Sequence, residues 1–93
     1  MKLDRAAKNK AASANLQRKY GITLADYNRM LKAQGGRCAI CGRKPSKTRR
    51  LDVDHSHKSG RIRGLLCHRD NRGLAWFSDN PATLRAAADY LSK

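Results

Sequence analysis

Two cysteines separated by two residues, Cys38 and Cys41, limit the folds open to this chain more than any other feature. Such a pair beside Gly42 is typical of a zinc knuckle, because two thiolates on one tight turn can bind the same ion. Twenty-five residues separate Cys41 from Cys67, enough for one β-hairpin that folds the third cysteine back onto the pair. The odd count and the close spacing favour a metal over a disulfide. The alternative is that the cysteines are small buried hydrophobic residues.

The identity of the fourth ligand is undecided, because the second half of this site reads Cys67-His68-Arg69-Asp70. A second Cys-x2-Cys pair would have a cysteine at position 70, where this chain has Asp70. A carboxylate oxygen is an acceptable zinc ligand, although it is harder than a thiolate. His68 is a rival that directly follows Cys67, and water could also complete the site. We expect structural zinc with these candidate ligands: Cys38, Cys41, Cys67 and Asp70.

The charge of the chain indicates a polyanionic partner. Its 93 residues include 21 Lys and Arg against 7 acidic residues, for a net charge of +14. Such an excess repels itself unless a polyanion offsets it, and nucleic acid is the commonest partner of this kind. The alternative is a solvated basic surface. No apolar run approaches the length of a membrane span, and no signal-peptide pattern is present, so we expect no membrane partner.

The length predicts one domain, preceded by a basic segment. Residues 1–19 are basic and rich in alanine, which is typical of a frayed helix or a disordered arm that can contact phosphates. We therefore divide the chain into this arm and a domain over residues 20–93. Thr23 is a predicted N-cap, and the glycine pair at 35–36 ends the helix that it begins. One face of that helix carries Leu24, Tyr27 and Leu31.

The second half of the chain predicts a hairpin followed by two helices. Residues 51–55 and 61–66 form the strands around a turn at Gly60. A helix is expected to begin near Asp70 or Asn71, and Pro81 suits the first position of the last helix. The aromatic residues Tyr27, Trp76 and Phe77 are expected in the core.

A second group of polar residues suits phosphodiester hydrolysis. A hard divalent ion prefers oxygen ligands, and Asp54 with the side-chain carbonyl of Asn71 would supply two of them. His55 could take a proton from water near neutral pH. Neighbours in a regular strand point to opposite faces, so Asp54 and His55 share a site only if the strand ends or bends there. Taken alone, the histidines could also be structural or bind zinc.

These residues carry a resemblance to a known family. The runs YGITLADYNRMLKAQGGRCAICG, LDVDHSHKSGRIRGLLC and NRGL resemble the phage recombination endonuclease VII group of HNH nucleases, in the ββα-metal (His-Me finger) class. The match covers roughly residues 20–91. The combination of CxxC, DHxH, GxxRGLLC and N is specific, whereas CxxC alone would be weak.

The resemblance implies roles for particular residues. His55 matches the general base, and Asp54 and Asn71 match the ligands of the catalytic ion, Mg²⁺ or Mn²⁺. His57 matches a second active-site histidine that contacts phosphate or assists the metal. The cysteines match three of the four structural zinc ligands, and Asp70 stands where the family has a fourth cysteine. The resemblance also explains Asn71, which the zinc site would place opposite Asp54 at the start of a helix.

The resemblance further implies an α+β fold: a small ββα-metal (HNH) domain with a β-hairpin, a zinc knuckle and flanking helices. It implies a metal-dependent DNA endonuclease acting on duplex or branched DNA. Larger members of the family carry additional C-terminal helices for dimerisation, so junction resolution is not carried over, and we expect a monomer or weak dimer that nicks or cleaves DNA with low sequence specificity. A phage or prophage origin, and hence the cytoplasm of the host cell, is implied with it. The alternative is a non-catalytic, zinc-stabilised module that binds nucleic acid. Four arginines are candidates for phosphate contacts: Arg61, Arg63, Arg69 and Arg72.

Overall fold

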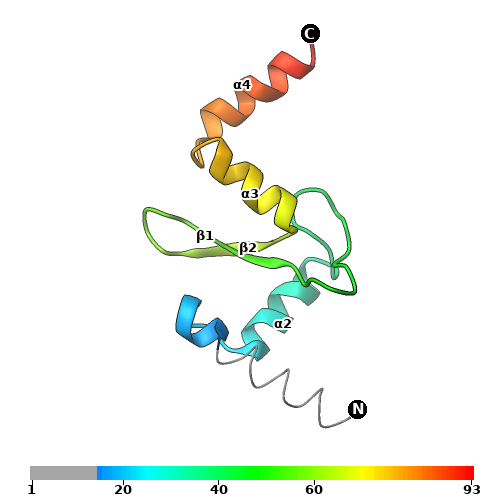
Figure 1. Ribbon diagram of the computed structural model, residues 1–93, viewed down its shortest axis with the longest axis vertical. Helices are drawn as coiled ribbons and strands as arrows, with labels where there is room; N and C mark the ends of the chain where they lie inside the picture. The colour runs from blue at the N-terminus through cyan, green and yellow to red at the C-terminus, as the bar shows by residue number, and fades with distance from the viewer. Residues whose placement is uncertain (1–14) are drawn as a thin grey trace.

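The structure, a computed structural model, describes residues 15–93, so residues 1–14 of the predicted arm lie outside the described residues. Residues 15–20 are helical. Five elements follow in the order α2 (Leu24–Ala33), β1 (Asp52–His55), β2 (Ile62–Leu66), α3 (His68–Trp76) and α4 (Pro81–Leu91) (Figure 1). The result is a small α+β fold with one antiparallel hairpin, as the sequence predicted. No helix in the described part of the chain is long and apolar enough to cross a bilayer.

The hairpin lies between two helical layers. In Figure 1, α2 and residues 15–20 lie on one side of the two strands, and α3 lies on the other. β1 and β2 pair regularly from Asp52–Leu66 to Asp54–Gly64, and then the register shifts so that His55 pairs with Ile62. Arg63 is therefore an extra residue on β2, which makes a β-bulge beside Asp54. A bulge of this kind bends the strand and re-aims a side chain, and it is common next to active sites.

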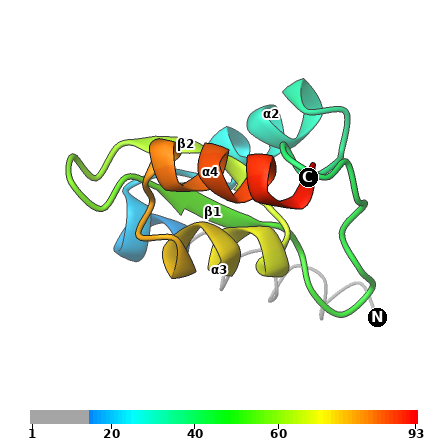
Figure 2. The ribbon, with the colours of Figure 1, turned by 90° about the horizontal axis from the view of Figure 1, so that it is seen from above.

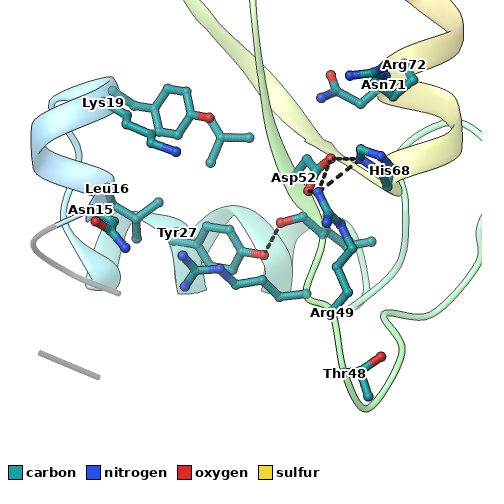
Figure 3. Close-up of a pocket in the computed structure, with 14 residues that line it drawn as sticks. Asn15, Leu16, Lys19, Tyr27, Thr48, Arg49, Asp52, His68, Asn71 and Arg72 are labelled. Atoms are coloured by element: carbon teal, nitrogen blue, oxygen red, sulfur yellow. Dashed lines mark hydrogen bonds and ion pairs between the residues drawn. The ribbon is translucent and has the colours of Figure 1, made fainter. Parts of the chain in front are cut away.

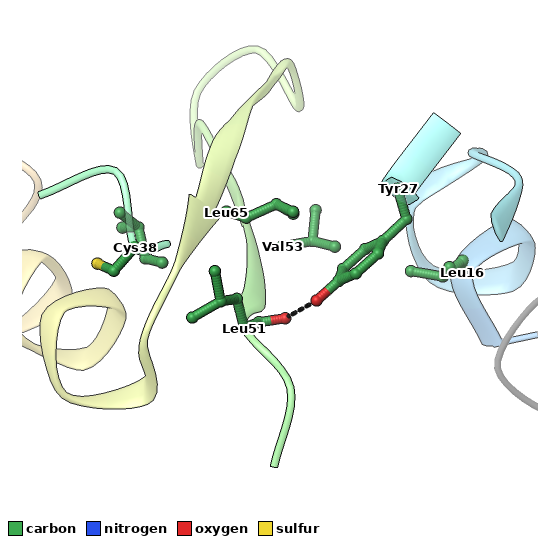
Figure 4. Packing of buried hydrophobic residues seen from close by; sticks show 7 residues of the cluster. Leu16, Tyr27, Cys38, Leu51, Val53 and Leu65 are labelled. Atoms are coloured by element: carbon green, nitrogen blue, oxygen red, sulfur yellow. Dashed lines mark hydrogen bonds between the residues drawn. The ribbon is translucent and has the colours of Figure 1, made fainter. Parts of the chain in front are cut away.

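A small apolar core fills the space between the hairpin and the helical segment that precedes β1. Tyr27 is buried in it and donates a hydrogen bond of 2.6 Å from its hydroxyl to the carbonyl of Leu51 (Figure 4). Leu16 is also fully enclosed, so part of the segment predicted as a basic arm packs with the domain. The boundary between a basic arm over residues 1–19 and a domain over residues 20–93 remains a prediction. The buried cluster comprises Leu16, Tyr27, Cys38, Leu51, Val53, Leu65 and Leu66.

The predicted caps of the first helix are present. Thr23 and Asp26 form a reciprocal capping box, in which each side chain accepts a hydrogen bond from the backbone N–H of the other. The glycines at 35–36 have positive φ angles of 69° and 74°, a conformation that costs glycine little, and the helix ends before them.

Two predictions for the later helices are wrong. α3 begins at His68 rather than near Asp70, because Cys67 is its N-cap and its sulfur accepts a hydrogen bond from the backbone N–H of Asp70. Trp76 and Phe77 are not core residues, since 79% and 39% of their surfaces are exposed. Of the apolar residues on this helix, Leu74 does pack against the core.

In Figure 1 the last helix, α4, lies beyond α3 on the side away from α2, and in the view from above in Figure 2 it lies in front of the hairpin. None of its residues is buried. It begins as predicted, with Pro81 in its first turn and the side chain of Asn80 accepting hydrogen bonds from two backbone N–H groups. Ser78 and Asp79 have left-handed φ angles of 56°, and they turn the chain sharply between α3 and α4.

Candidate metal centre and active site

Three cysteines and one aspartate converge at the junction of the knuckle and α3. One ligand atom from each of these residues lies within 4.8 Å of the others: Cys38, Cys41, Cys67 and Asp70. The sulfurs of Cys41 and Cys67 are 3.8 Å apart, and the sulfur of Cys38 is 3.2 Å from Oδ2 of Asp70. The structure thus brings Asp70 to the cysteines and leaves His68 outside the cluster, which forms a Cys3Asp group that could bind zinc.

Local hydrogen bonds hold the two halves of this Cys3Asp cluster together. The knuckle turn closes through the N–H of Gly42, which donates 3.1 Å to the carbonyl of Cys38. Gly42 has a φ of 72°, which glycine adopts easily. The N–H of Ala39 donates to the carbonyl of Leu65, so the knuckle is tied directly to β2. The helix that begins after Cys67 then presents Asp70 from its first turn.

The protonation chemistry of the cluster suits a metal. Burial raises the pKa of the Asp70 carboxyl, but hydrogen bonds from the thiols of Cys41, Cys38 and Cys67, and from Arg69, outweigh it and lower the pKa to about 2. Burial raises the pKa of the Cys67 thiol, the backbone N–H of Asp70 lowers it, and hydrogen bonding to the Asp70 carboxylate helps raise it to about 11. Without metal, therefore, the protonated thiol of Cys67 is hydrogen-bonded to the ionised carboxylate of Asp70. Zinc binding replaces such thiol protons, so it releases protons and depends on pH.

The distances fit tetrahedral zinc. With Zn–S bonds of about 2.3 Å, two thiolates of a tetrahedral site lie roughly 3.8 Å apart. The separation of the Cys41 and Cys67 sulfurs is 3.8 Å. Cys38 is 4% exposed, whereas Cys41 is exposed at the surface, so an ion could enter from the side of Cys41.

His68 belongs to a second polar group, across α3 from the cysteines. Its Nδ1 lies 3.0 Å from Oδ2 of Asp52, and Nη2 of Arg49 lies 3.0 Å from Oδ1 of the same carboxylate. Nη2 of Arg49 donates to Asp52 and also lies 3.0 Å from Nδ1 of His68, so the three side chains form one hydrogen-bonded group. The resulting cluster closes one side of a cavity of about 500 Å³ (Figure 3).

This basic cavity lies between residues 15–20 and α3, with β1 along its floor. Asn71 and Arg72 of α3 line it on one side, and Lys19 and Tyr20 line it on the other. Because the sheet has two strands and β1 pairs only with β2, the edge of β1 is open toward the cavity in the described part of the chain. The cavity offers a phosphate several cationic side chains: Lys19, Arg49, Arg50 and Arg72.

Asp54 is the buried carboxylate of the hairpin, with 7% of its surface exposed. Arg63 donates to both of its oxygens, at 2.8 Å and 3.0 Å, and also pairs with Asp79 at 2.8 Å. Hydrogen bonds with these two carboxylates raise the pKa of Arg63 further above its usual high value. Regular alternation would turn Arg63 with Leu65 toward the core, and the bulge turns it instead toward Asp54.

Helical spacing places Asn71 on the same face of α3 as His68 and Leu74. His68, Asn71 and Leu74 recur every three residues on α3 and so share one face. The first of them contacts Asp52, and the last lines a smaller cavity together with Asp54. Asn71 therefore lies on the face of α3 that is turned toward β1, and a shared site with Asp54 remains a prediction. No hydrogen bond joins Asn71 to Asp54 in the described structure.

His55 lies at the end of β1, beyond the point where the register shifts. Its ring is 5.7 Å from that of Tyr20 and 5.2 Å from that of His57, measured between centroids. Tyr20 also lines the basic cavity, so His55 adjoins the end of that cavity nearest residues 15–20. Asp54 is buried against Arg63 and lines a separate, smaller cavity, so the structure does not bring it into the basic cavity that His55 adjoins. His57 itself lines another cavity, shared with Arg63 and Asp79.

The four arginines predicted to contact phosphate have different surroundings. Arg63 is held by two carboxylates, and Arg69 is paired with Asp70 at 3.1 Å. No carboxylate of residues 15–93 lies within ion-pair distance of Arg61 or Arg72. Arg72 is thus the candidate that combines an available charge with a place in the basic cavity. Phosphate contact remains a prediction for all four.

Sequence reasoning missed two groups that surround the candidate site. One is the Asp52–His68–Arg49 cluster, and the other is the pairing of Arg63 with Asp54 and Asp79. A signal existed for the first: Asp52 and Asp54 alternate on one strand face, and His68 precedes Asn71 by three residues. No local signal predicts the second, because it depends on a bulge and on the turn after α3.

Comparison with known proteins gives a consistent result. The model of the family described as "Recombination endonuclease VII" matches residues 13–93. The chain is 49% identical over 75 residues to the "Gene 59 protein" of Mycobacterium phage D29, which covers 80% of this chain and 46% of that protein. It is 47% identical over 73 residues to the "Gene 59 protein" of Mycobacterium phage L5, which covers 77% of this chain and 44% of that protein. The chain thus spans about half the length of these relatives, and no solved structure matches it.

Proposed function

This chain belongs to the recombination endonuclease VII family, and from that premise we propose that it is a metal-dependent endonuclease that hydrolyses phosphodiester bonds in DNA. The family indicates a nuclease that acts on DNA. The finer assignment to the HNH type, with His55 as general base and a single catalytic divalent ion, is our proposal. It places the protein in the cytoplasm of a phage-infected or prophage-bearing host cell.

The observation that supports the proposal best is the arrangement around the open edge of β1. Asp54 lines a cavity with Leu74 of α3, Asn71 of α3 lines the basic cavity, and His55 lies next to Tyr20 of that cavity. The cationic residues of the basic cavity would hold phosphates of the DNA strand.

The donor set suits a hard divalent cation such as Mg²⁺ or Mn²⁺. Asp54 offers carboxylate oxygens and Asn71 an amide oxygen, which are the ligand types that such ions prefer. Arg63 donates one hydrogen bond to each oxygen of Asp54, and each oxygen keeps a second lone pair for a cation. The ion would supply electrostatic stabilisation of the scissile phosphate and the leaving oxygen.

The protein side chains would divide the remaining work. His55 would accept a proton from the attacking water, a role that needs the neutral imidazole near pH 7. His57, whose ring lies next to that of His55, would contact the phosphate or support the metal site. The Cys3Asp cluster would bind structural zinc and fix the start of α3, and thereby the position of Asn71 relative to β1.

Plasmid nicking tests this proposal. With Mg²⁺ or Mn²⁺ the wild-type protein should convert supercoiled plasmid into the nicked form, and His55→Ala should lower the rate on the order of 10²–10⁴-fold. The melting temperature of His55→Ala should match that of the wild type, because His55 is not part of the buried core. Equal nicking by both proteins, or none by the wild type with any divalent ion, would remove the proposal.

One observation favours a second candidate, a non-catalytic zinc-stabilised module that binds nucleic acid. Arg63 already satisfies both oxygens of Asp54, which is how a purely structural carboxylate is held. Such a module would bind DNA in a salt-sensitive way without cleaving it. His55→Ala would then leave DNA binding unchanged, and no metal would bring out nicking.

A further inference from the structure

The chain has a single tryptophan, and it is exposed at the end of α3. Trp76 leaves 79% of its surface open to solvent, although indole is among the most apolar side chains. The neighbouring Phe77 is also partly exposed, at 39%. A tryptophan fixed on a helix, with none of residues 15–93 covering most of its surface, is available to stack on another flat ring.

The surroundings of Trp76 point to an anionic partner rather than an apolar one. Arg72 precedes it by four residues, so both side chains lie on the same face of α3. With Ala75 they line a shallow cavity of about 280 Å³, to which Ala75 contributes only a methyl group. Arg72 also lines the basic cavity, and no carboxylate of residues 15–93 pairs with it. Arg72 therefore lies between Trp76 and the basic cavity that is predicted to bind phosphate.

We propose that Trp76 stacks on an unpaired base of the DNA, while Arg72 binds a phosphate of the same strand. The substrate being DNA rests on the proposed function. Trp76 lies one helical turn, about 6 Å along the axis, from Arg72, so the stacked base belongs to a nucleotide next to the phosphate that Arg72 binds. Bases inside a duplex already stack on each other, so this contact selects DNA that has an unpaired base.

The tryptophan supplies its own readout. Full-length wild-type protein would be titrated, with no divalent ion added, with three probes of equal length: a single-stranded oligonucleotide, its abasic analogue and a duplex. Binding would be followed by anisotropy of a dye on the DNA, and stacking by Trp76 fluorescence. Base–aromatic stacking contributes enough that its loss weakens binding by roughly 5- to 100-fold.

The expected result has two parts. The single strand should quench Trp76, and the abasic strand and the duplex should bind without quenching it. Trp76→Ala should weaken single-strand binding by roughly 5- to 100-fold and change duplex binding far less, while Trp76→Tyr should restore most of the affinity. Tyr90→Ala, at a tyrosine on α4 that is 74% exposed, is the matched control and should bind as the wild type does.

Other outcomes overturn the inference. Saturation with the single strand without quenching, or equal losses in Trp76→Ala on all three probes, would show that no base stacks there. Quenching by added protein alone, without DNA, would assign the surface to a second copy of the chain. Because no step depends on cleavage, stacking without nicking would refute only the proposed catalysis, and nicking without stacking would refute only this inference.

Discussion

The Cys3Asp cluster and the proposed catalytic residues adjoin at residues 67–71, yet the fold holds them differently. The four cluster residues have ligand atoms within 4.8 Å of one another, tied by hydrogen bonds of the knuckle, β2 and the first turn of α3. The catalytic candidates are spread around the edge of β1. Asp54 is paired with Arg63, Asn71 lies in the basic cavity, and His55 contacts Tyr20 and His57.

This difference in how the two sites are held indicates how each would respond to its ligand, zinc at the cluster and a cation with DNA around β1. In the cluster, the four ligand atoms already lie within 4.8 Å of one another, so zinc can bind with little rearrangement. Around β1, a cation would share Asp54 with Arg63, and DNA would add phosphates to a cavity that is rich in arginine. We therefore expect the first site to determine stability and the second to determine activity.

The largest effect is expected from loss of the zinc site through Cys41→Ser. Cys41 is exposed, so the substitution removes a ligand without opening a hole in the core, as a change at the buried Cys38 would. Zinc content should fall from about one ion per chain to near zero, and the free energy of unfolding should fall with it, because metal binding is coupled to folding. Elemental analysis and thermal unfolding measure the two quantities.

A chelator added to the wild type is the control for that experiment, since it should lower the melting temperature in the same way. Asp70→Cys should bind zinc more tightly than the wild type, because thiolate is the softer ligand. If Cys41→Ser keeps its zinc and its melting temperature, the cluster is not a metal site.

A smaller loss of stability is expected from Arg63→Ala. The change leaves the buried carboxylate of Asp54 without a partner, and an unsatisfied buried polar group costs about 1–3 kcal/mol. Chemical denaturation would measure the difference in free energy of unfolding. Arg61→Ala, on the same segment and without an ion pair among the described residues, should cost little. Unchanged stability of Arg63→Ala together with a large loss of DNA affinity would make Arg63 a phosphate contact rather than a structural partner of Asp54.

The smallest effect is expected from Arg72→Ala. Loss of one phosphate contact should weaken DNA binding evenly across sequences and reduce the slope of log affinity against log salt by about 1. Binding measured over a series of salt concentrations gives this slope. Arg85→Ala, on the exposed face of α4, should keep the wild-type slope, and an unchanged slope in Arg72→Ala would remove Arg72 from the DNA contact surface.

The cysteine cluster could be predicted from the sequence because its geometry is local. Two ligands share one turn, and the other two share the first turn of a helix, so spacing alone brings each pair together. The hairpin between Asp52 and Leu66 was equally predictable from its alternating pattern and its turn. The capping box at Thr23 also follows from a few neighbouring residues.

The sequence could not reveal features that depend on contacts across the fold. The pairing of Arg63 with Asp54 depends on a β-bulge that no residue type in this segment predicts. Trp76 was expected in the core because helical aromatics near leucines usually pack inward, but α4 leaves α3 without covering it. Leu16 was assigned to a polar segment because its neighbours are basic, and burial depends on what packs against it rather than on its neighbours.

The central claim is that adjacent residues at the start of α3 serve two sites, Asp70 the zinc cluster and Asn71 the catalytic ion. The most direct test measures zinc content, melting temperature and Mg²⁺-dependent plasmid nicking on one preparation of Asn71→Ala, with the exposed Asn28→Ala as control. We predict about one zinc per chain, an unchanged melting temperature, and nicking reduced by roughly 10- to 100-fold or more, since even outer-shell partners of metal ligands have effects of this size. Wild-type nicking by Asn71→Ala, or loss of its zinc, would contradict the claim.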